Sequence, residues 1–274
     1  MSPLLADALS LPGTLVPMPP GGPPGTRPRP DWAQRALDLV VGSALAVLAA
    51  PVIGLAMLAV KLTSRGPAIY TQTRLGRYGK PFVIYKLRSM THNCEKKSGV
   101  QWCKKNDARV TRVGWLLRKT HIDELPQLWN ILRGEMSLVG PRPERPEIVA
   151  KLEVLLPRYR DRLAVRPGLT GLAQVQLPPD TDLESVRRKL RYDLCYVATG
   201  TAWMDARLLV STLFHVLGLP FGVSRGLLGL PGEPEVEPER LAPTVTPVVD
   251  SNADTATHSI PATICEVSVG AARA

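Results

Sequence analysis

Two adjacent carboxylates, Asp123 and Glu124, are the residues of this sequence that point most directly to chemistry. They precede a segment that reads as a short helix, because its apolar residues recur at i, i+3, i+4 and i+7, Pro126 suits a first turn and Gly134 suits an end. We expect Asp123 at the N-cap and the buried helix face to consist of Leu125, Leu128, Trp129 and Leu132.

At the positive end of a helix dipole, both carboxylates would stay ionised, beside backbone N–H groups that can help to hold an anion. The alternative is purely structural. Aspartate is a common N-cap residue, so Asp123 could simply cap the helix while Glu124 decorates its first turn.

Arginines are the second candidate group, because a guanidinium can clamp a phosphate through two hydrogen bonds. Arg142 stands between Pro141 and Pro143, which leaves its backbone little freedom to lose. Arg88 follows a short strand predicted over residues 81–86, and could be either a phosphate ligand or a solvated surface charge.

Two further patterns carry less information. Pro167 and Gly168 stand in the order that a type II turn requires. His92, Cys94 and Cys103 match no standard zinc spacing, so we expect no metal cluster there. The four cysteines contain no Cys-x-x-Cys pair, which favours a reducing compartment over a disulfide scaffold.

The location of the candidate site residues depends on an apolar run from Leu39 to Val60. Its 22 residues carry no charge, and about 20 suffice to cross a bilayer. Pro51 lies near its middle and predicts a kink. Basic residues flank both ends, which favours both ends on the cytoplasmic side. We therefore expect a re-entrant helix broken at Pro51; a spanning helix with a tolerated proline and a buried soluble helix are the alternatives.

The positive charge is concentrated next to this run. Residues 61–125 hold 15 Lys and Arg against four Asp and Glu, so this stretch alone carries +11, compared with +10 for the whole chain. Such a patch fits lipid headgroups or a phosphorylated substrate. Nucleic acid is disfavoured, because the sequence contains no recognised binding module.

Composition divides the chain into four parts. Residues 1–30, with nine prolines and four glycines, are expected to be a disordered N-terminal tail. Residues 31–62 form the expected re-entrant membrane helix, residues 63–222 a small cytoplasmic catalytic domain, and residues 223–274 a disordered C-terminal tail. The expected fold class is α+β, rich in helices with short strands. The apolar stretch 203–217 is expected either to lie in the membrane interface or to pack on the core.

Several segments together resemble the bacterial sugar transferase family, the monotopic polyprenyl-phosphate sugar-1-phosphate transferases. The resemblance covers roughly residues 31–217, and its most specific segment is HIDELPQLWNILRGEMSLVGPRPE at 121–144. The other matching segments are DWAQR at 31–35, QTRLGRYGKPFVIYKLRSM at 72–90, RPGLTGLAQV at 166–175 and YDLCYV at 192–197.

The resemblance implies transfer of a sugar-1-phosphate from a UDP-sugar to a polyprenyl phosphate, with release of UMP, at the start of exopolysaccharide or other surface glycan synthesis. It also implies a Mg²⁺ requirement and an active site at the cytoplasmic face of the bacterial inner membrane. Asp123 matches the family nucleophile, and Glu124 its acidic partner, which is thought to hold the metal. The positions expected near the phosphates or the nucleotide are Arg88, Arg112, Arg142 and Gln174.

An aspartate nucleophile fits the chemistry of a double displacement, since its carboxylate can form a phospho-aspartyl intermediate that the lipid phosphate then resolves. Two other functions compete with this one. A non-catalytic membrane adaptor would need the basic patch but not the acidic pair beside a Pro-locked arginine. A hydrolase would release the sugar phosphate to water. The sequence does not identify the sugar, the length of the polyprenyl chain or the oligomeric state.

Overall fold

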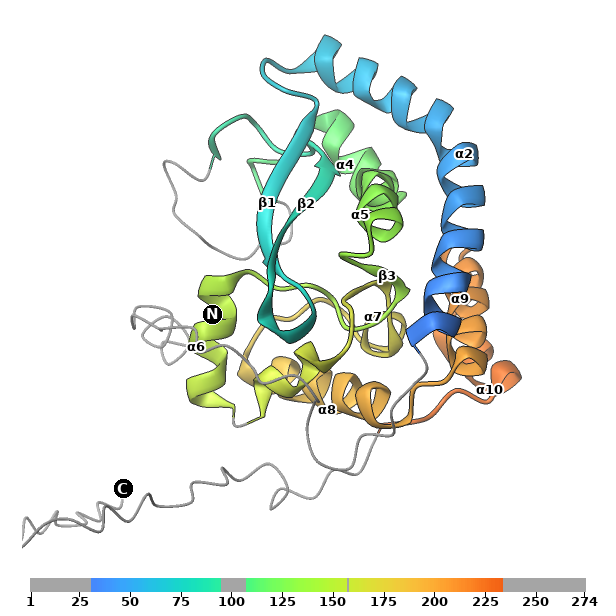
Figure 1. Cartoon of the computed structure of the whole chain (residues 1–274). Helices are drawn as coiled ribbons and strands as arrows, with labels where there is room; N and C mark the ends of the chain where they lie inside the picture. Colours follow the sequence, from blue (N-terminus) through green and yellow to red (C-terminus); the bar gives the residue numbers. More distant parts are fainter. Residues whose placement is uncertain (1–30, 95–106, 157, 234–274) are drawn as a thin grey trace, which may run out of the picture. The chain divides into compact units, whose positions relative to one another are not determined.

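The computed structural model describes residues 31–94, 107–156 and 158–233 (Figure 1). The disorder expected for residues 1–30 and 234–274, and the position of Cys103, lie outside this part of the chain. The strands are β1 (Ile69–Leu75), β2 (Pro81–Leu87), β3 (Ser137–Val139) and β4 (Gly168–Thr170). The α-helices are α2 (Asp31–Thr63), α4 (Arg112–Lys119), α5 (Leu128–Arg133), α6 (Pro146–Leu155), α7 (Leu172–Gln176), α8 (Leu183–Thr199), α9 (Ala202–Val216) and α10 (Phe221–Leu228). The 3-10 helices are η1 (Arg77–Gly79), η2 (Ile122–Gln127) and η3 (Tyr159–Ala164).

Strands β1 and β2 form an antiparallel hairpin, with Ile69 opposite Leu87 and Leu75 opposite Pro81. The strand predicted from residue 81 is thereby confirmed. The connecting turn places Tyr78 and Gly79 at positive φ values of 59° and 74°. This tight turn closes the hairpin, and Lys86 lies near the other end of β2, opposite Tyr70.

Strands β3 and β4 pair in parallel, and they approach each other more closely than side chains would permit. A Cβ atom on Gly168 would lie 2.0 Å from the backbone nitrogen of Gly140. The type II turn expected at Pro167 and Gly168 is wrong, because Gly168 begins β4 and is not among the glycines at positive φ. Glycine is required at this position for the close approach of two backbones rather than for a turn.

Helix α2 is one 33-residue helix with Pro51 inside it, and Figure 1 shows that it bends partway along its length. It is the described helix that is long and apolar enough to cross a membrane, by length and composition alone. One stripe of the helix is buried along its whole length: Gln34, Asp38, Gly42, Ala49, Ala56 and Val60. The opposite face exposes large apolar residues, among them Val40, Val47, Leu55 and Leu62.

Polar side chains attach the start of α2 to the rest of the protein. Asp38 is fully buried and accepts hydrogen bonds from Ser137 Oγ and Leu138 N, each at 2.8 Å. Arg35 donates to the carbonyls of Ile131 and Leu132 at the end of α5, each at 2.6 Å. Such bonds fix the helix more specifically than apolar packing alone.

The far end of α2 packs on the same body. Val60 lies in an apolar cluster with Leu87 of β2 and Leu117 of α4, and Ser64, just beyond the helix, accepts a hydrogen bond from Arg88. Both ends of α2 therefore contact one compact unit.

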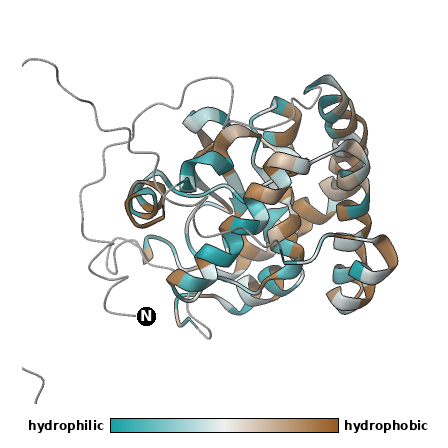
Figure 2. Cartoon of the chain, turned by 90° about the horizontal axis from the view of Figure 1, so that it is seen from below, coloured by the Kyte–Doolittle hydropathy of each residue, from teal (hydrophilic) through white to brown (hydrophobic). Residues whose placement is uncertain are grey.

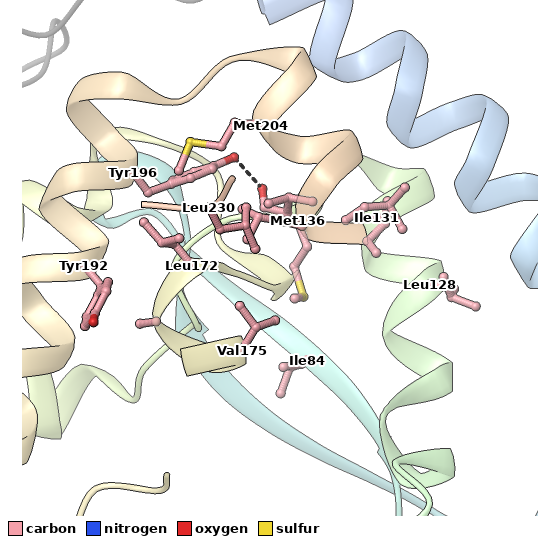
Figure 3. Packing of buried hydrophobic residues seen from close by; sticks show 14 of the residues in the cluster. Ile84, Leu128, Ile131, Met136, Leu172, Val175, Tyr192, Tyr196, Met204 and Leu230 are labelled. Atoms are coloured by element: carbon pink, nitrogen blue, oxygen red, sulfur yellow. Dashed lines mark hydrogen bonds between the residues drawn. The ribbon is translucent and has the colours of Figure 1, made fainter. Parts of the chain in front are cut away.

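The main core lies between α5, the short strands and the helices α7 to α9 (Figure 3). It includes Ile84, Ile131 and Met136, which are almost completely buried. Tyr196 of α8 reaches into this core, and its hydroxyl donates to the carbonyl of Val139 at 3.1 Å (Figure 3). The same hydroxyl lies 2.9 Å from a carboxylate oxygen of Asp205. Strand β3 is thus held between α2 on one side and α8 and α9 on the other.

Helices at the periphery carry both hydrophobic and hydrophilic residues (Figure 2). Helix α9, which covers most of the predicted 203–217 stretch, packs Met204 and Leu208 on the core and exposes Trp203 and Leu213. Packing on the core is therefore confirmed for this stretch. Contact of its exposed face with the membrane interface stays a prediction.

The C-terminal boundary of the folded part was expected at residue 222, and this was wrong. Helix α10 continues to Leu228, and Leu230 is 5% exposed within the main core. Ser224 is buried against Ser211 of α9, with their hydroxyls 3.1 Å apart. The composition beyond residue 225 resembles a tail, but Phe221 and Leu228 pack on the core together with Leu230. Arg207 of α9 also donates hydrogen bonds to the carbonyls of Leu228 and Gly229, at 3.1 and 2.9 Å.

Shortening the chain at two places tests this boundary. A chain ending at Glu233 keeps α10 and Leu230 and should retain the melting temperature of the full chain. A chain ending at Leu219 loses the burial of Leu230, worth about 1.5–3 kcal/mol, and should melt several degrees lower by circular dichroism in detergent. Equal melting temperatures for the two chains would show that α10 adds nothing to the fold.

Candidate active site

Asp123 and Glu124 lie within η2, a 3-10 helix, and not at the start of an α-helix. His121, in the left-handed conformation with φ of 56°, is the N-cap residue, so the expected N-cap role of Asp123 is wrong. The α-helix begins only at Leu128. A 3-10 segment has about three residues per turn, so it rotates the side-chain pattern relative to an α-helix. Consequently Trp129 is 57% exposed, while Gln127 and Ile131 are buried.

Glu124 is held by two cations from different elements. Lys86 of β2 donates to Glu124 Oε1 at 2.7 Å. Arg142, in the loop after β3, donates to Oε1 at 2.5 Å and to Oε2 at 3.2 Å, as a two-pronged ion pair. The side chains of Glu124 and Lys86 are 13% and 18% exposed and that of Arg142 is 37% exposed, so the arginine faces the solvent side of the cluster.

This pairing fixes the charge of Glu124. Burial alone would raise the pKa of its carboxyl, but Arg142 and then Lys86 outweigh burial and hold the pKa well below its usual range. Burial lowers the pKa of the Lys86 ammonium, and the nearby Arg142 lowers it further, while Glu124 opposes both effects. Glu124 therefore stays ionised at neutral pH.

The pKa of Asp123 is shifted in the direction opposite to that of Glu124. Asp123 is 8% exposed. Burial and the charge of Glu124 raise the pKa of its carboxyl, and Lys86, Arg118 and His121 act in the opposite direction. Two adjacent carboxylates thus have pKa values pushed apart by their surroundings, which is a frequent property of functional sites. Glu124 is the carboxylate held by close ion pairs with Lys86 and Arg142, and Asp123 is the carboxylate that binds its proton more tightly than usual.

The other arginines proposed from the sequence occupy different places. Arg88 is 5% exposed and donates through Nη2 to the carbonyl and hydroxyl of Ser64, at 2.9 and 2.7 Å. Its Nε and Nη1 atoms are buried, with no hydrogen-bond partner among the described residues. Arg112 is exposed in the first turn of α4. A solvated surface position for Arg88 is therefore excluded.

Gln174 lies in α7, just after β4, and its Nε2 donates to the carbonyl of Leu169 at 2.9 Å. Its Oε1 is buried, with no hydrogen-bond partner in the described part of the chain. The hydrogen bonds and ion pairs that join site residues directly are those of Glu124 with Arg142 and Lys86. Among the described residues, no hydrogen bond or ion pair joins Arg88, Arg112 or Gln174 to this cluster.

Lys86 ends the strand predicted over residues 81–86, where it was expected to be exposed and was given no role; its side chain is 18% exposed and pairs with Glu124. Its position near the end of the predicted strand indicated a possible site role, because a cation at the end of a strand can reach a neighbouring element. The partner could not be known before the fold had placed η2 beside β2.

Hard oxygen donors suit magnesium, and Asp123 and Glu124 supply two carboxylates. Among the described residues no group of three His, Cys, Asp or Glu side chains is arranged to hold a metal ion. Glu124 Oε2 accepts only one of the three hydrogen bonds to this carboxylate, so it keeps room for one more ligand. These donors fit a magnesium ion shared with substrate phosphates, and they do not fit a closed site made by protein alone.

The family is established by comparison with known proteins. The family model described as "Bacterial sugar transferase" matches residues 29–218. A UDP-glucose:undecaprenyl-phosphate glucose-1-phosphate transferase of Caulobacter vibrioides is 45% identical over 205 residues, which are 74% of this chain and 76% of that protein. This chain belongs to the bacterial sugar transferase family.

Two further relatives differ in name and length. A UDP-N-acetylgalactosamine-undecaprenyl-phosphate N-acetylgalactosaminephosphotransferase of Aeromonas hydrophila is 40% identical over 69% of this chain and 45% of its own length. The exopolysaccharide production protein PSS of Rhizobium leguminosarum bv. phaseoli is 41% identical over 67% of this chain and 94% of its own length. The match thus covers less than half of the first relative and almost all of the second.

The stability of Asp123→Asn distinguishes a functional carboxylate from a structural one. Because the folded state raises the pKa of Asp123, the folded protein binds this proton more tightly than the unfolded chain does. Ionised Asp123 therefore lowers the free energy of unfolding, and this loss appears as the pH rises from about 4, the pKa in an unfolded chain. Asp123→Asn should be at least as stable as the parent at pH 7.5, and the difference should shrink toward pH 4. Denaturant titrations at both pH values measure it, and a clearly less stable variant at pH 7.5 would assign Asp123 a structural role.

Proposed function

We propose that this protein transfers a sugar-1-phosphate from a UDP-sugar to undecaprenyl phosphate and releases UMP, as the membrane-bound first step of exopolysaccharide or related glycan synthesis. One observation carries this proposal. A buried Asp123 with a raised pKa lies beside Glu124, which two cations keep ionised, in a chain of the bacterial sugar transferase family. The names of the three relatives described above support the donor, the acceptor and the product.

The reaction is proposed as two displacements at one phosphorus atom. A carboxylate oxygen of Asp123 attacks the sugar-bearing phosphorus of the donor, the bond to the bridging oxygen breaks, and UMP leaves with the electron pair. A phosphate oxygen of the lipid then attacks the same phosphorus, and the Asp123 carboxylate leaves. The first step exchanges the phosphoanhydride bond of the donor for an acyl phosphate bond, and the second exchanges this for the phosphoanhydride bond of the lipid diphosphate, so no oxidant or additional co-substrate is needed.

Arg142 and Lys86 are proposed to stabilise the negative charge that develops on the leaving phosphate. Arg142 is 37% exposed, so part of its guanidinium is open to an incoming diphosphate while the rest stays paired with Glu124. Fixed cations of this kind act without reorganising during the reaction. Arg88, Arg112 and Gln174 are proposed to contact the phosphates or the nucleotide, and the unpartnered buried atoms of Arg88 and Gln174 are consistent with such roles.

Magnesium is proposed to bind at Glu124 together with the diphosphate, where it would offset charge on the phosphate oxygens. The contribution of this chain is to keep Glu124 ionised and correctly oriented, through Lys86 and Arg142. Because these two cations oppose a third positive charge, we expect the metal to bind tightly only together with the donor.

Helix α2 is proposed to be a re-entrant membrane helix, with the catalytic unit on the cytoplasmic face of the inner membrane. Both of its ends contact one compact unit: Asp31 pairs with Arg77, and Val60 packs on Leu87 and Leu117. A spanning helix would carry its two ends to opposite faces, roughly 30 Å apart. The buried stripe leaves only the outer face of α2 for contact with lipid acyl chains.

A burst experiment tests the mechanism. Enzyme with Mg²⁺ and a suitable UDP-sugar should release close to one UMP per active site before any lipid is added, and intact-protein mass spectrometry should detect the phosphosugar adduct. Asp123→Asn should abolish both signals, a loss of at least 100-fold in burst rate. A panel of UDP-sugars finds the donor. An active Asp123→Asn enzyme would remove the nucleophile from the scheme, and continuous UMP release without lipid would favour a hydrolase instead.

Thiol labelling tests the membrane topology. Single cysteines replace Arg29 or Lys80 in a chain from which the four native cysteines are removed. A membrane-impermeant maleimide should label neither site in intact cells and both after permeabilisation, because the two ends of α2 lie on one side. External labelling at position 29 alone would establish a spanning helix. Pro51→Leu restores a helix hydrogen bond and should shift the segment toward that state.

A further inference from the structure

The loop that carries Arg142 is fixed through its main chain as well as through its guanidinium. Four consecutive carbonyls, from Pro141 to Glu144, each accept a hydrogen bond from a different partner. The donors, in chain order of the acceptors, are Gly168 N at 2.9 Å, Arg162 Nη2 at 2.9 Å, Arg74 Nη1 at 3.1 Å and Leu75 N at 3.0 Å. The carbonyl of Arg142 itself is the one that Arg162 holds.

Arg162 is placed to act as a fixed support. Its side chain is 1% exposed. Its Nε and Nη2 lie 2.9 and 2.7 Å from Asp193 Oδ2 in α8, and its Nη1 lies 3.2 Å from the hydroxyl of Tyr159. Each of its three nitrogens therefore has a partner, and Nη2 also reaches the carbonyl of Arg142. Only the planar, branched guanidinium can join partners in three directions from one buried point.

Helix α8 supplies the counter-charges from a single face. Asp193 holds Arg162, and Lys189, one turn earlier, pairs directly with Glu144 at 2.9 Å. Residues four apart on a helix lie above one another. The helix therefore fixes the loop at two points, through Arg162 at residue 142 and through Lys189 at residue 144.

A buried ion pair contributes little net stability, because desolvation of the two charges offsets their attraction. Stability alone therefore does not explain why Arg162 and Asp193 lie in the core. The hydrogen bond from Arg162 to the carbonyl of Arg142 offers an explanation, because a charged donor holds a carbonyl more strongly than a neutral donor does.

We propose that Arg162, oriented by Asp193, is a positioning residue that fixes the main chain of Arg142 so that its guanidinium meets Glu124 and the donor diphosphate. The inference rests on the proposed function. A shift of about 1 Å at a catalytic group can lower the rate on the order of 100-fold. Loss of the support should therefore slow the first displacement even though Arg142 itself is retained.

The test removes the two buried charges together. Arg162→Met with Asp193→Leu replaces the pair by apolar side chains, so neither charge is left unpaired. The melting temperature should stay close to that of the parent, while the rate constant of the UMP burst should fall roughly 10- to 100-fold at saturating donor. The matched control is Arg160→Met with Glu153→Leu, a pair 3.2 Å apart that also joins η3 to a neighbouring helix. The control should keep the parental burst.

Asp193→Asn provides a second, smaller change. It keeps the shape of the side chain but weakens its hold on Arg162, and it should lower the burst rate about 3- to 10-fold per folded molecule, with little change in the Michaelis constant for the donor. A core ion pair without a positioning role predicts the reverse, a lower melting temperature with an unchanged rate per folded molecule.

Each outcome distinguishes a positioning role of the Arg162–Asp193 pair from a purely structural role. A parental burst in folded Arg162→Met/Asp193→Leu overturns the positioning role, and so does failure of both Arg162 and Asp193 variants to fold, since the pair would then be structural. If the parent and the Arg160 control release no UMP with any UDP-sugar, it is the proposed function that fails. A slow burst in the double variant beside a normal burst in the control supports the positioning role.

Discussion

The ion pair of Glu124 with Lys86 and Arg142 is the interaction on which the rest of the site depends. It joins three parts of the chain that are distant in sequence: the end of the first hairpin, the 3-10 helix η2 and the loop after β3. One carboxylate thereby does two things. It fixes the relative positions of these segments, and it keeps two cations beside Asp123, with Lys86 mostly buried and Arg142 turned toward the solvent. Asp123 is then the neighbouring carboxylate whose pKa is raised.

The surrounding fold can be understood as the support of this cluster. Strand β3 is clamped by Asp38 of α2 on one side and by Tyr196 of α8 on the other, and the loop carrying Arg142 follows it directly. The glycines at positions 140 and 168 let the two parallel strands approach so closely that the loop starts at a defined point. Short strands with few ladder bonds would not hold a loop alone. Side chains from several helices supply the missing rigidity.

The sequence predicted the elements that have a strong local signal. Local patterns predicted the helix from residue 31, the strand from residue 81 and the acidic pair beside an arginine between two prolines. Apolar periodicity, charge and proline determine local structure over a few residues, so they can be read from the sequence. Features that depend on distant contacts could not be predicted from the sequence. The predictions that Asp123 is an N-cap and that Trp129 is buried were wrong, because a left-handed His121 and a 3-10 helix precede the α-helix. Gly168 looked like a turn residue, and Leu230 like part of a tail, until their partners at Gly140 and in the core were known.

The attachment of α2 also bears on how the protein is made. The partners of Asp38 lie 99 and 100 residues further along the chain, and those of Gln34 lie 103 and 105 residues away. During synthesis from the N-terminus, the whole apolar helix therefore leaves the ribosome long before the residues that bind Gln34 and Asp38 are made. In that interval the nascent helix can be received by a membrane or by a targeting factor. The catalytic unit then folds onto a helix that is already in place.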